Sequence, residues 1–476
     1  MCYKTLYFIH QISITISMVL LKIIFSALAV GIFAIFYGIS HMIKPGPIPV
    51  LENTYWGPGI FTEDDPTIKP FRIKLEESVL NDLHLRLNIT RLIATPLENS
   101  QTRYGYTGKA LEDSLKFLRY EYNFQQQLDF LNSLPQFTTQ IQGLQIHFVH
   151  VKPEITNVKV LPILLLHGWP SSVRSFYKMA RRLSVLEEGR DFVFEVVVPS
   201  LPGFGYSDAP AKKDCQTPEV AVIFKNLMER LGHEEFYVHG EDWGAIVATN
   251  MATLFPDRIL GHHSNFCLSL LYKSLLKITV GMVFPSLVFP NQFQYKWYPP
   301  QVSIRWIFGE SGYLHLQGTK PDTVGVSLDN SIEGLVAFMF EKMAVGTNKD
   351  AVEFDDGGLH RRFNYTSLFD NLFFYYWLPK KATTAARFYA ENLNVNAFAR
   401  GVHNIPIDPN VPCGCTFFEH EFLYFPEEIL KDKYTNLIHF TTYRDGGHFV
   451  ALEFPDKITN DLITFIKRTL HKEKEL

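Results

Sequence analysis

At the centre of this chain lies the stretch His239-Gly240-Glu241-Asp242-Trp243-Gly244. Residues 235–238 before it have the aromatic and β-branched character of a strand, and residues 245–252 after it can open an apolar helix. The flanking glycines let the backbone turn sharply between the two elements without a Cβ clash. A strand, a tight turn and a helix in this order are typical of a nucleophile elbow, with Asp242 at its tip.

The carboxylate of Asp242 limits the chemistry that this turn can support. It needs no base to activate it, because it is already ionised at neutral pH. It suits attack on an electrophilic carbon with a strained or good leaving group, such as an epoxide or a carbon–halogen bond. A serine esterase is disfavoured because the turn contains neither Ser nor Cys. The simpler alternative is a surface turn with a charged tip, since the short pattern alone is common.

Residues 161–166 upstream form a short continuous apolar run, typical of a strand buried on both faces of a parallel sheet, and residues 194–199 are predicted to be another buried strand. Strands that alternate with helices indicate a doubly wound α/β fold. The first run leads into His167-Gly168-Trp169-Pro170. In an α/β-hydrolase, backbone N–H groups after an early strand and after the nucleophile form the oxyanion hole, which predicts Trp169 and Trp243 for these positions. The alternative for Trp169 is a turn with a packing tryptophan.

A candidate catalytic histidine follows the last predicted strand, residues 437–443. His448 comes after two glycines and before a helix, and the triad of this fold runs nucleophile, acid, histidine along the chain. With 17 His in the chain, its position rather than its type carries the argument. The acid should follow the preceding strand, near residues 411–418, where Glu419 and Glu421 both qualify.

Composition sets outer limits on the function. The net charge of −4 and the lack of a long basic block give no reason to expect nucleic acid as a partner. The five Cys are scattered and odd in number, which predicts reduced thiols facing the cytosol rather than a disulfide framework. Cys413 and Cys415 are too close together for the usual zinc pair and no second pair exists, so no metal site is expected.

The N-terminus is predicted to be a membrane anchor. No Asp, Glu, Lys or Arg lies between Lys22 and Lys44, and a helix of this length spans ~30 Å of hydrocarbon. We expect one transmembrane helix at about residues 23–39, with the more polar run 5–21 optional. A cleaved signal peptide is the alternative. Lysines flank both ends of the span, so the positive charges leave its orientation open.

Six short motifs follow one another along nearly the whole chain. They are Trp56-Gly57-Pro58-Gly59, His167-Gly168-Trp169-Pro170, Gly240-Glu241-Asp242-Trp243-Gly244, Ser311-Gly312-Tyr313, Arg387-Phe388-Tyr389 and Gly446-Gly447-His448-Phe449. Together with the N-terminal anchor they resemble the microsomal epoxide hydrolase family, which includes the insect juvenile hormone epoxide hydrolases. Glu241 departs from the glycine often seen just before the nucleophile.

The resemblance implies a role for each remaining site residue. It places the acid at Glu421, with Glu419 as the fallback, and its task is to orient the imidazole of His448. It also implies that Tyr313 and Tyr389 reach down from a helical cap and donate hydrogen bonds to the epoxide oxygen. A phenol suits this role as a general acid for a developing alkoxide. Packing is the alternative for either tyrosine alone, because the chain has 22 Tyr.

The expected fold is an α/β-hydrolase fold with a helical cap, an N-terminal wrapping segment and a single transmembrane anchor. The predicted divisions are residues 1–44 (anchor), 45–153 (linker and N-terminal epoxide-hydrolase segment), 154–266 and 394–476 (core), and 267–393 (cap). The predicted function is hydrolysis of apolar epoxides, juvenile-hormone-like or xenobiotic, to vicinal diols through a covalent aspartyl ester, with water and no cofactor or metal. The predicted location is the endoplasmic reticulum membrane, with the catalytic domain cytosolic; the oligomeric state is left open. A haloalkane dehalogenase and a non-catalytic binding protein are the alternatives.

Overall fold

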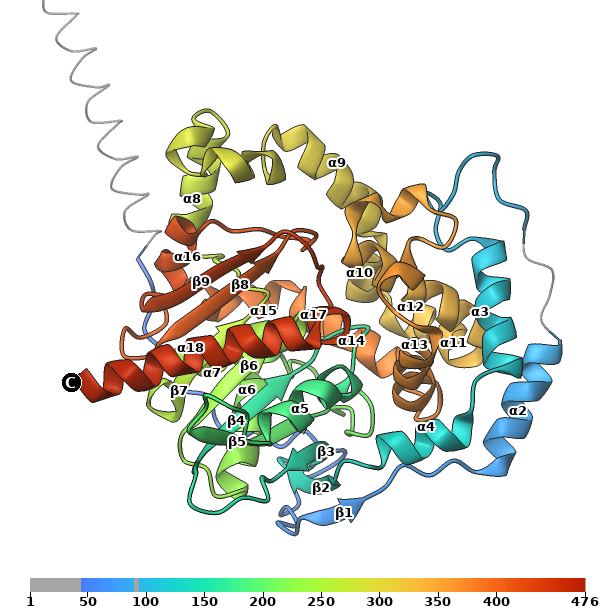
Figure 1. Ribbon diagram of the computed structural model, residues 1–476, viewed down its shortest axis with the longest axis horizontal. Coiled ribbons are helices and arrows are strands. Elements are labelled where there is room, and N and C mark those ends of the chain that lie inside the picture. Colours follow the sequence, from blue (N-terminus) through green and yellow to red (C-terminus); the bar gives the residue numbers. More distant parts are fainter. Residues whose placement is uncertain (1–43, 90–93, 476) are drawn as a thin grey trace, which may run out of the picture.

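The computed structural model describes residues 44–89 and 94–475 (Figure 1). The predicted anchor at residues 23–39 lies outside these ranges, as does the optional run 5–21. Among the described residues, no helix is both long and apolar enough to cross a bilayer.

The described chain builds one nine-stranded sheet, in which six parallel strands form the half that carries the elbow. The last four residues of β4 are buried, and so is all of β5 except Glu195, because helices cover both faces of the sheet, which explains why these strands are mainly apolar. The strand order is β1-β2-β3-β5-β4-β6-β7-β8-β9. The strands are β1 (Lys69–Phe71), β2 (Gln136–Ile141), β3 (Leu144–Val151), β4 (Lys159–Leu166), β5 (Phe192–Pro199), β6 (Phe236–Gly240), β7 (Ile259–Ser264), β8 (Cys413–Phe418) and β9 (Leu437–Tyr443).

The N-terminal segment adds three antiparallel strands to one edge of this sheet. β2 and β3 form a hairpin, with Gln142 and Gly143 at positive φ in the turn. β3 then pairs with β5, so the segment continues the core sheet instead of only wrapping it. Its helices contact the cap. They are α2 (Glu77–Asn88), α3 (Gly108–Tyr120) and α4 (Phe124–Leu131), at the right of Figure 1.

The cap is inserted between β7 and β8 and is helical throughout its described length, as expected. Figure 1 shows it in yellow and orange beside the carboxyl ends of the parallel strands. Its α-helices are α8 (Tyr272–Gly281), α9 (Pro300–Glu310), α10 (Gly312–Thr319), α11 (Pro321–Asn330), α12 (Ile332–Thr347), α13 (Tyr365–Leu372), α14 (Ala382–Asn392) and α15 (Val395–Ala399).

Helices of the core position the loops that bear the site. α7 contacts β4, β6 and β7, and α6 packs against α7, whereas α18 contacts α5 and the strands β7 to β9. The short α17 follows the His448 loop directly. The helices are α5 (Tyr177–Leu183), α6 (Thr217–Arg230), α7 (Trp243–Leu254), α16 (Glu427–Lys433), α17 (Val450–Glu453) and α18 (Pro455–Glu475).

The prediction that the cysteines are reduced is wrong for one pair. Cys267, three residues past β7, forms a disulfide with Cys415 in β8. The scattered spacing hid this pair, because the two cysteines are 148 residues apart and only the pairing of β7 with β8 brings them together. Cys215 and Cys413 are free and buried.

Candidate active site

The turn between β6 and α7 has the strand–turn–helix geometry expected from the sequence. Asp242 lies between them at φ 51° and ψ −126°, a strained conformation for a residue with a side chain. The two glycines permit the close packing of this turn. A Cβ on Gly240 would lie 2.3 Å from the carbonyl oxygen of Gly244, and one on Gly244 would lie 2.1 Å from that of Leu166. Larger residues at these positions would push the turn apart.

The two carboxylate oxygens of Asp242 have different partners. The backbone N–H of Trp169 donates to Oδ1 at 2.8 Å, and His448 Nε2 lies 3.1 Å from Oδ2. Gly168 leaves room for the carboxylate, since a Cβ there would lie 2.1 Å from Oδ1. The predicted oxyanion donor Trp169 therefore contacts Oδ1. If Oδ2 attacks the substrate, Oδ1 becomes the carbonyl oxygen of the aspartyl ester.

His448 is buried between two carboxylates. Its Nδ1 lies 2.7 Å from Glu421 Oε1, and the backbone N–H of Phe422 donates to the same oxygen. Burial alone would lower the pKa of His448, but the charges of Glu421 and Asp242 and their hydrogen bonds raise it to about 10. In the resting site the ring is therefore an imidazolium at neutral pH.

The fallback acid lies elsewhere. Glu419 is half-buried and interacts with Tyr295 and with the Lys296 ammonium, whose Nζ is 3.0 Å from its Oε1. The structure brings Glu421 and not Glu419 against His448.

The two cap tyrosines come from α10 and α14 and meet above the elbow. The ring of Tyr313 stacks on Trp169 at 5.2 Å, and the ring of Tyr389 lies edge-on to Trp243 at 5.0 Å. Burial, together with the charge of Asp242, raises the pKa of both phenols above the ordinary value. Both therefore keep their protons at any physiological pH, as a hydrogen-bond donor must.

Trp243 begins α7, so its backbone N–H lies in the first turn of the helix, where the dipole favours negative charge. Its indole Nε1 is buried, and its ring lies against that of Tyr389. The roles of Trp243, Trp169 and the other site residues stay predictions that the geometry supports.

Two carboxyl groups beneath the site were not assigned a role from the sequence. Glu241 accepts from the backbone N–H of Ala451 at 3.0 Å, and Glu453 accepts from those of Gly447 and Phe449 at 3.1 Å each. Burial raises the pKa of each to about 8, against the opposing effect of these hydrogen bonds. Both tie the His448 loop in place. The only signal for Glu241 was its departure from the glycine expected there.

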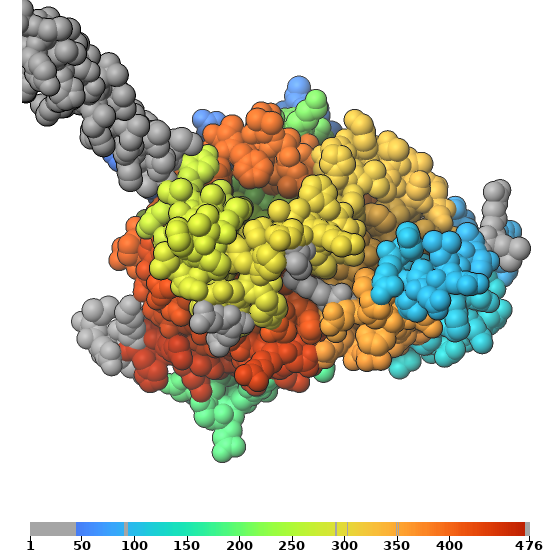
Figure 2. Space-filling view, turned by 90° about the horizontal axis from the view of Figure 1, so that it is seen from above, coloured from blue at the N-terminus to red at the C-terminus, as the bar shows by residue number. Residues whose placement is uncertain are grey.

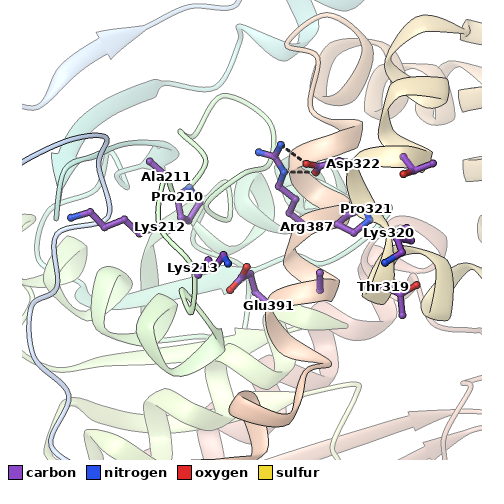
Figure 3. A pocket seen from close by; sticks show the side chains of 12 residues that line it. Pro210, Ala211, Lys212, Lys213, Thr319, Lys320, Pro321, Asp322, Arg387 and Glu391 are labelled. Atoms are coloured by element: carbon purple, nitrogen blue, oxygen red, sulfur yellow. Dashed lines mark hydrogen bonds and ion pairs between the residues drawn. The ribbon is translucent and has the colours of Figure 1, made fainter.

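A hollow of about 430 Å³ lies beside α14, between residues 210–213 and residues 319–323 (Figure 3). Lys212, Lys320 and Arg387 are among the residues that line it. Arg387 belongs to the same motif as Tyr389, but its Nε donates to Asp322 at 2.6 Å. The motif thus places a catalytic candidate on one side of α14 and an ion pair on the other.

Among the described residues, two groups of His and acidic side chains lie close enough together to hold a metal ion. In each group, hydrogen bonds already join the members: His439 Nε2 lies 2.8 Å from Asp461 Oδ1, and His150 Nε2 lies 2.7 Å from Glu195 Oε1. Nδ1 of His263 lies 2.9 Å from Nδ1 of His239 in β6, but neither group includes Asp242, and the expectation that no metal takes part stays a prediction. The groups are His263, His439 and Asp461, and His150, Glu195 and His233.

Comparison with known proteins identifies the family. The family model "Epoxide hydrolase N terminus" matches residues 68–176, and a model of the α/β-hydrolase fold matches residues 162–265. The chain is 41% identical to the juvenile hormone epoxide hydrolase of Bombyx mori, over 89% of this chain and 92% of that protein. The chain belongs to the epoxide hydrolase family. Epoxide hydrolase 1 of Oryctolagus cuniculus is 37% identical, over 87% and 92% of the two chains.

Solved structures of epoxide hydrolases support the same family assignment. The crystal structure of the Bombyx mori juvenile hormone epoxide hydrolase is 40% identical and superposes with a TM-score of 0.86, covering 88% of this chain and 99% of that one. The epoxide hydrolase of Aspergillus niger is 26% identical with a TM-score of 0.68, over 85% and 97% of the two chains. This protein is therefore an epoxide hydrolase with the α/β-hydrolase fold.

Proposed function

We propose that this epoxide hydrolase works through a covalent ester on Asp242. Its Oδ2 attacks one carbon of the epoxide while Tyr313 and Tyr389 donate hydrogen bonds to the ring oxygen, which leaves as an alkoxide and takes a proton. The supporting observation is the asymmetric setting of the carboxylate, with Oδ1 held by the Trp169 N–H and Oδ2 beside His448. The product of this half-reaction is a hydroxyalkyl ester.

The same arrangement supports the hydrolysis of that ester. Alkylation removes the negative charge of Asp242, which is one of the two charges that raise the pKa of His448. The imidazolium then loses its proton more readily, and the neutral ring, still oriented by Glu421, can deprotonate a water. The water attacks the ester carbonyl carbon, and the N–H groups of Trp169 and Trp243 stabilise the oxyanion on Oδ1. The bond between the carbonyl carbon and Oδ2 then breaks, and Oδ2 leaves as a hydroxyl oxygen of the diol after it takes the proton from His448.

The substrate class that we propose is an apolar epoxide, with a juvenile-hormone-like terpenoid ahead of other lipid or xenobiotic epoxides. Two similar insect proteins, 38% and 41% identical, are named juvenile hormone epoxide hydrolases. The rings of Trp169, Trp243, Tyr313 and Tyr389 surround the nucleophile with apolar surface.

A substrate panel tests this proposal. Purified protein is given a terpenoid ester epoxide, an aryl epoxide and an alkyl chloride, and diol and chloride are measured; the Asp242→Ala variant is the control. We expect diol from both epoxides, a higher kcat/KM for the terpenoid, and no chloride. Chloride release would favour the dehalogenase, and a higher kcat/KM for the aryl epoxide would overturn the substrate preference.

We also propose that residues 23–39 anchor the enzyme in the endoplasmic reticulum membrane. The support is the uncharged stretch between Lys22 and Lys44. The predicted cytosolic side of the catalytic domain stays open to test, and the Cys267–Cys415 disulfide counts against it, because the cytosol keeps thiols reduced.

A further inference from the structure

The first part of the cap exposes an unusual number of large apolar side chains. In and after α8, the exposed fractions reach 71% for Val283 and 78% for Leu287, and Phe308 at the end of α9 is 82% exposed. Scattered apolar residues are normal on a protein surface, but a contiguous group marks a binding surface. We name this group the α8–α9 surface. It comprises Tyr272, Leu275, Leu276, Val280, Met282, Val283, Phe284, Leu287, Tyr295, Ile304, Ile307 and Phe308.

All charged side chains between Asp257 and Glu310 are basic. No Asp or Glu lies between Asp257 and Glu310, whereas Lys273, Lys277 and Arg305 are present. The two lysines of α8 are held by Asp432 of α16, with Nζ–O distances of 2.9 and 2.7 Å, and stay partly exposed. An apolar face bordered by basic side chains is typical of a segment that lies in the interface of an anionic membrane.

A side chain of the core joins this surface to the end of the proposed anchor. Asn404 Nδ2 donates to the backbone oxygen of Lys44 at 3.5 Å, and Asn404 Oδ1 accepts from the backbone N–H of Tyr272 at 2.9 Å. Lys44 ends the uncharged stretch, and Tyr272 begins α8. The point where the chain leaves the proposed anchor is therefore beside the first turn of α8. Figure 2 shows the segment 267–310, in yellow-green and yellow, spread over one face of the molecule.

We propose that the α8–α9 surface is a second membrane-contact site, which lies on the lipid bilayer next to the anchor. This inference rests on the proposed anchor and goes beyond the hydrolase activity. α8 has 10 residues, too few to cross the bilayer, and its Ser274 and Ile278 are buried in the protein. It therefore lies along the membrane surface, with its outer face in the lipid headgroups and upper acyl chains.

The contact has a consequence for the substrate. A hollow of about 310 Å³ lies between α9 and the loop after β8, lined in part by Trp306, Ile307 and Phe422. The ring of Phe422 lies 5.9 Å from that of Trp306 and 4.5 Å from that of His448. A bilayer against α9 would place this hollow where an apolar epoxide is most concentrated, within one aromatic side chain of the catalytic histidine.

Spin-label depth on the full-length chain tests the proposal. The chain, with Cys2→Ser to remove the one cysteine outside the described residues, is reconstituted into phosphatidylcholine–phosphatidylserine vesicles. A nitroxide is placed at Val283→Cys or, as the control, at Val185→Cys. Both are exposed valines just after a helix, at 71% and 61%, but Val185 follows α5 of the core. Buried Cys215 and Cys413 and the disulfide pair leave no other site to label.

We expect the Val283 label to be several-fold more accessible to oxygen than to a water-soluble nickel complex, relative to the Val185 label. Equal accessibility of the two positions would overturn the proposal. Spin–spin broadening at Val283 in detergent without lipid would overturn it too, because a second copy of the chain would then cover the surface. Flotation of the same vesicles after a carbonate wash, which strips a surface contact but not a transmembrane helix, tests the anchor, and diol formation by the same samples tests the hydrolase, so the three can fail separately.

Discussion

The proposed nucleophile is Asp242, and its neighbours distinguish its two oxygens. Oδ1 faces the Trp169 N–H, and Oδ2 faces the ring of His448. The sequence predicted these residues individually because each follows a strand in a recognisable motif. Strand position alone left Glu419 and Glu421 both possible, since two residues of one loop differ only in where the folded loop points them, and the family resemblance favoured Glu421.

The tyrosines give the first prediction. Phenylalanine at Tyr313 or Tyr389 should slow ring opening, and the double change should nearly abolish it, because general-acid assistance is worth ~10²–10⁴-fold in rate. The rate of alkylation, followed by stopped flow before the steady state, measures this. Tyr298→Phe is the control, since this buried cap tyrosine donates to Ile278 far from the elbow. Wild-type alkylation in the double variant would remove both tyrosines from the mechanism.

Glu241 gives a prediction about pH. The titratable groups near it are His239 at 4.0 Å, whose pKa burial lowers well below the ordinary value, and His448, Glu421 and Glu453. Burial raises its pKa from 4.5 to about 8, so between these pH values the unfolded chain loses a proton that the folded chain keeps. The contribution of Glu241 to the free energy of unfolding must therefore fall over this range as pH rises.

The Glu241→Gln variant keeps an oxygen for the Ala451 N–H but carries no titrating group. Its melting temperature relative to wild type should therefore rise between pH 5 and pH 8, as measured by calorimetry. Glu241→Ala should instead be destabilised at both pH values, because it leaves that N–H without an acceptor. If the melting temperature of Glu241→Gln differed from that of wild type by the same amount at pH 5 and at pH 8, the raised pKa of Glu241 would be contradicted.

At the scale of elements, the loops that follow β4 and β6 come into contact at Gly168 and Asp242. Gly168→Ala should keep the fold but displace the Asp242 carboxylate, because the new Cβ would lie 2.1 Å from Oδ1. A shift of this kind can cost ~10²-fold in kcat/KM. Steady-state kinetics check it beside Gly309→Ala in α9, where a Cβ meets nothing within 4 Å. Unchanged kinetics in the Gly168 variant would show that the nucleophile has room to adjust.

Apolar runs and turn residues predicted the strands of the core, because these are local signals. The pairing of β3 with β5 was not predictable, since it depends on which edge of the sheet is free. The helices of the cap were expected as a class, but their contacts with α2 and α3 join segments more than 200 residues apart. Such contacts have no local signature.

For the whole molecule, the Cys267–Cys415 disulfide closes the loop that contains the entire cap. Cys267→Ala should lower the free energy of unfolding by ~2–5 kcal/mol, as is usual when a native disulfide is lost. Denaturant titration measures this, with Cys413→Ala as the control that removes a buried free thiol. Peptide mapping of unreduced protein from microsomes should yield the linked pair. Two separate reduced peptides would contradict the bond and restore the cytosolic expectation.

The central claim is that Asp242 becomes covalently bound to the substrate. Loss of activity in Asp242→Ala cannot distinguish a nucleophile from a general base, because both mechanisms give the same diol. A single turnover in ¹⁸O-water, with enzyme in excess over epoxide, can. The account predicts mostly unlabelled diol and an ¹⁸O atom in the peptide that carries Asp242, since the first oxygen comes from the carboxylate and water replaces it. Fully labelled diol with an unlabelled Asp242 peptide would contradict the covalent mechanism and leave direct attack by water.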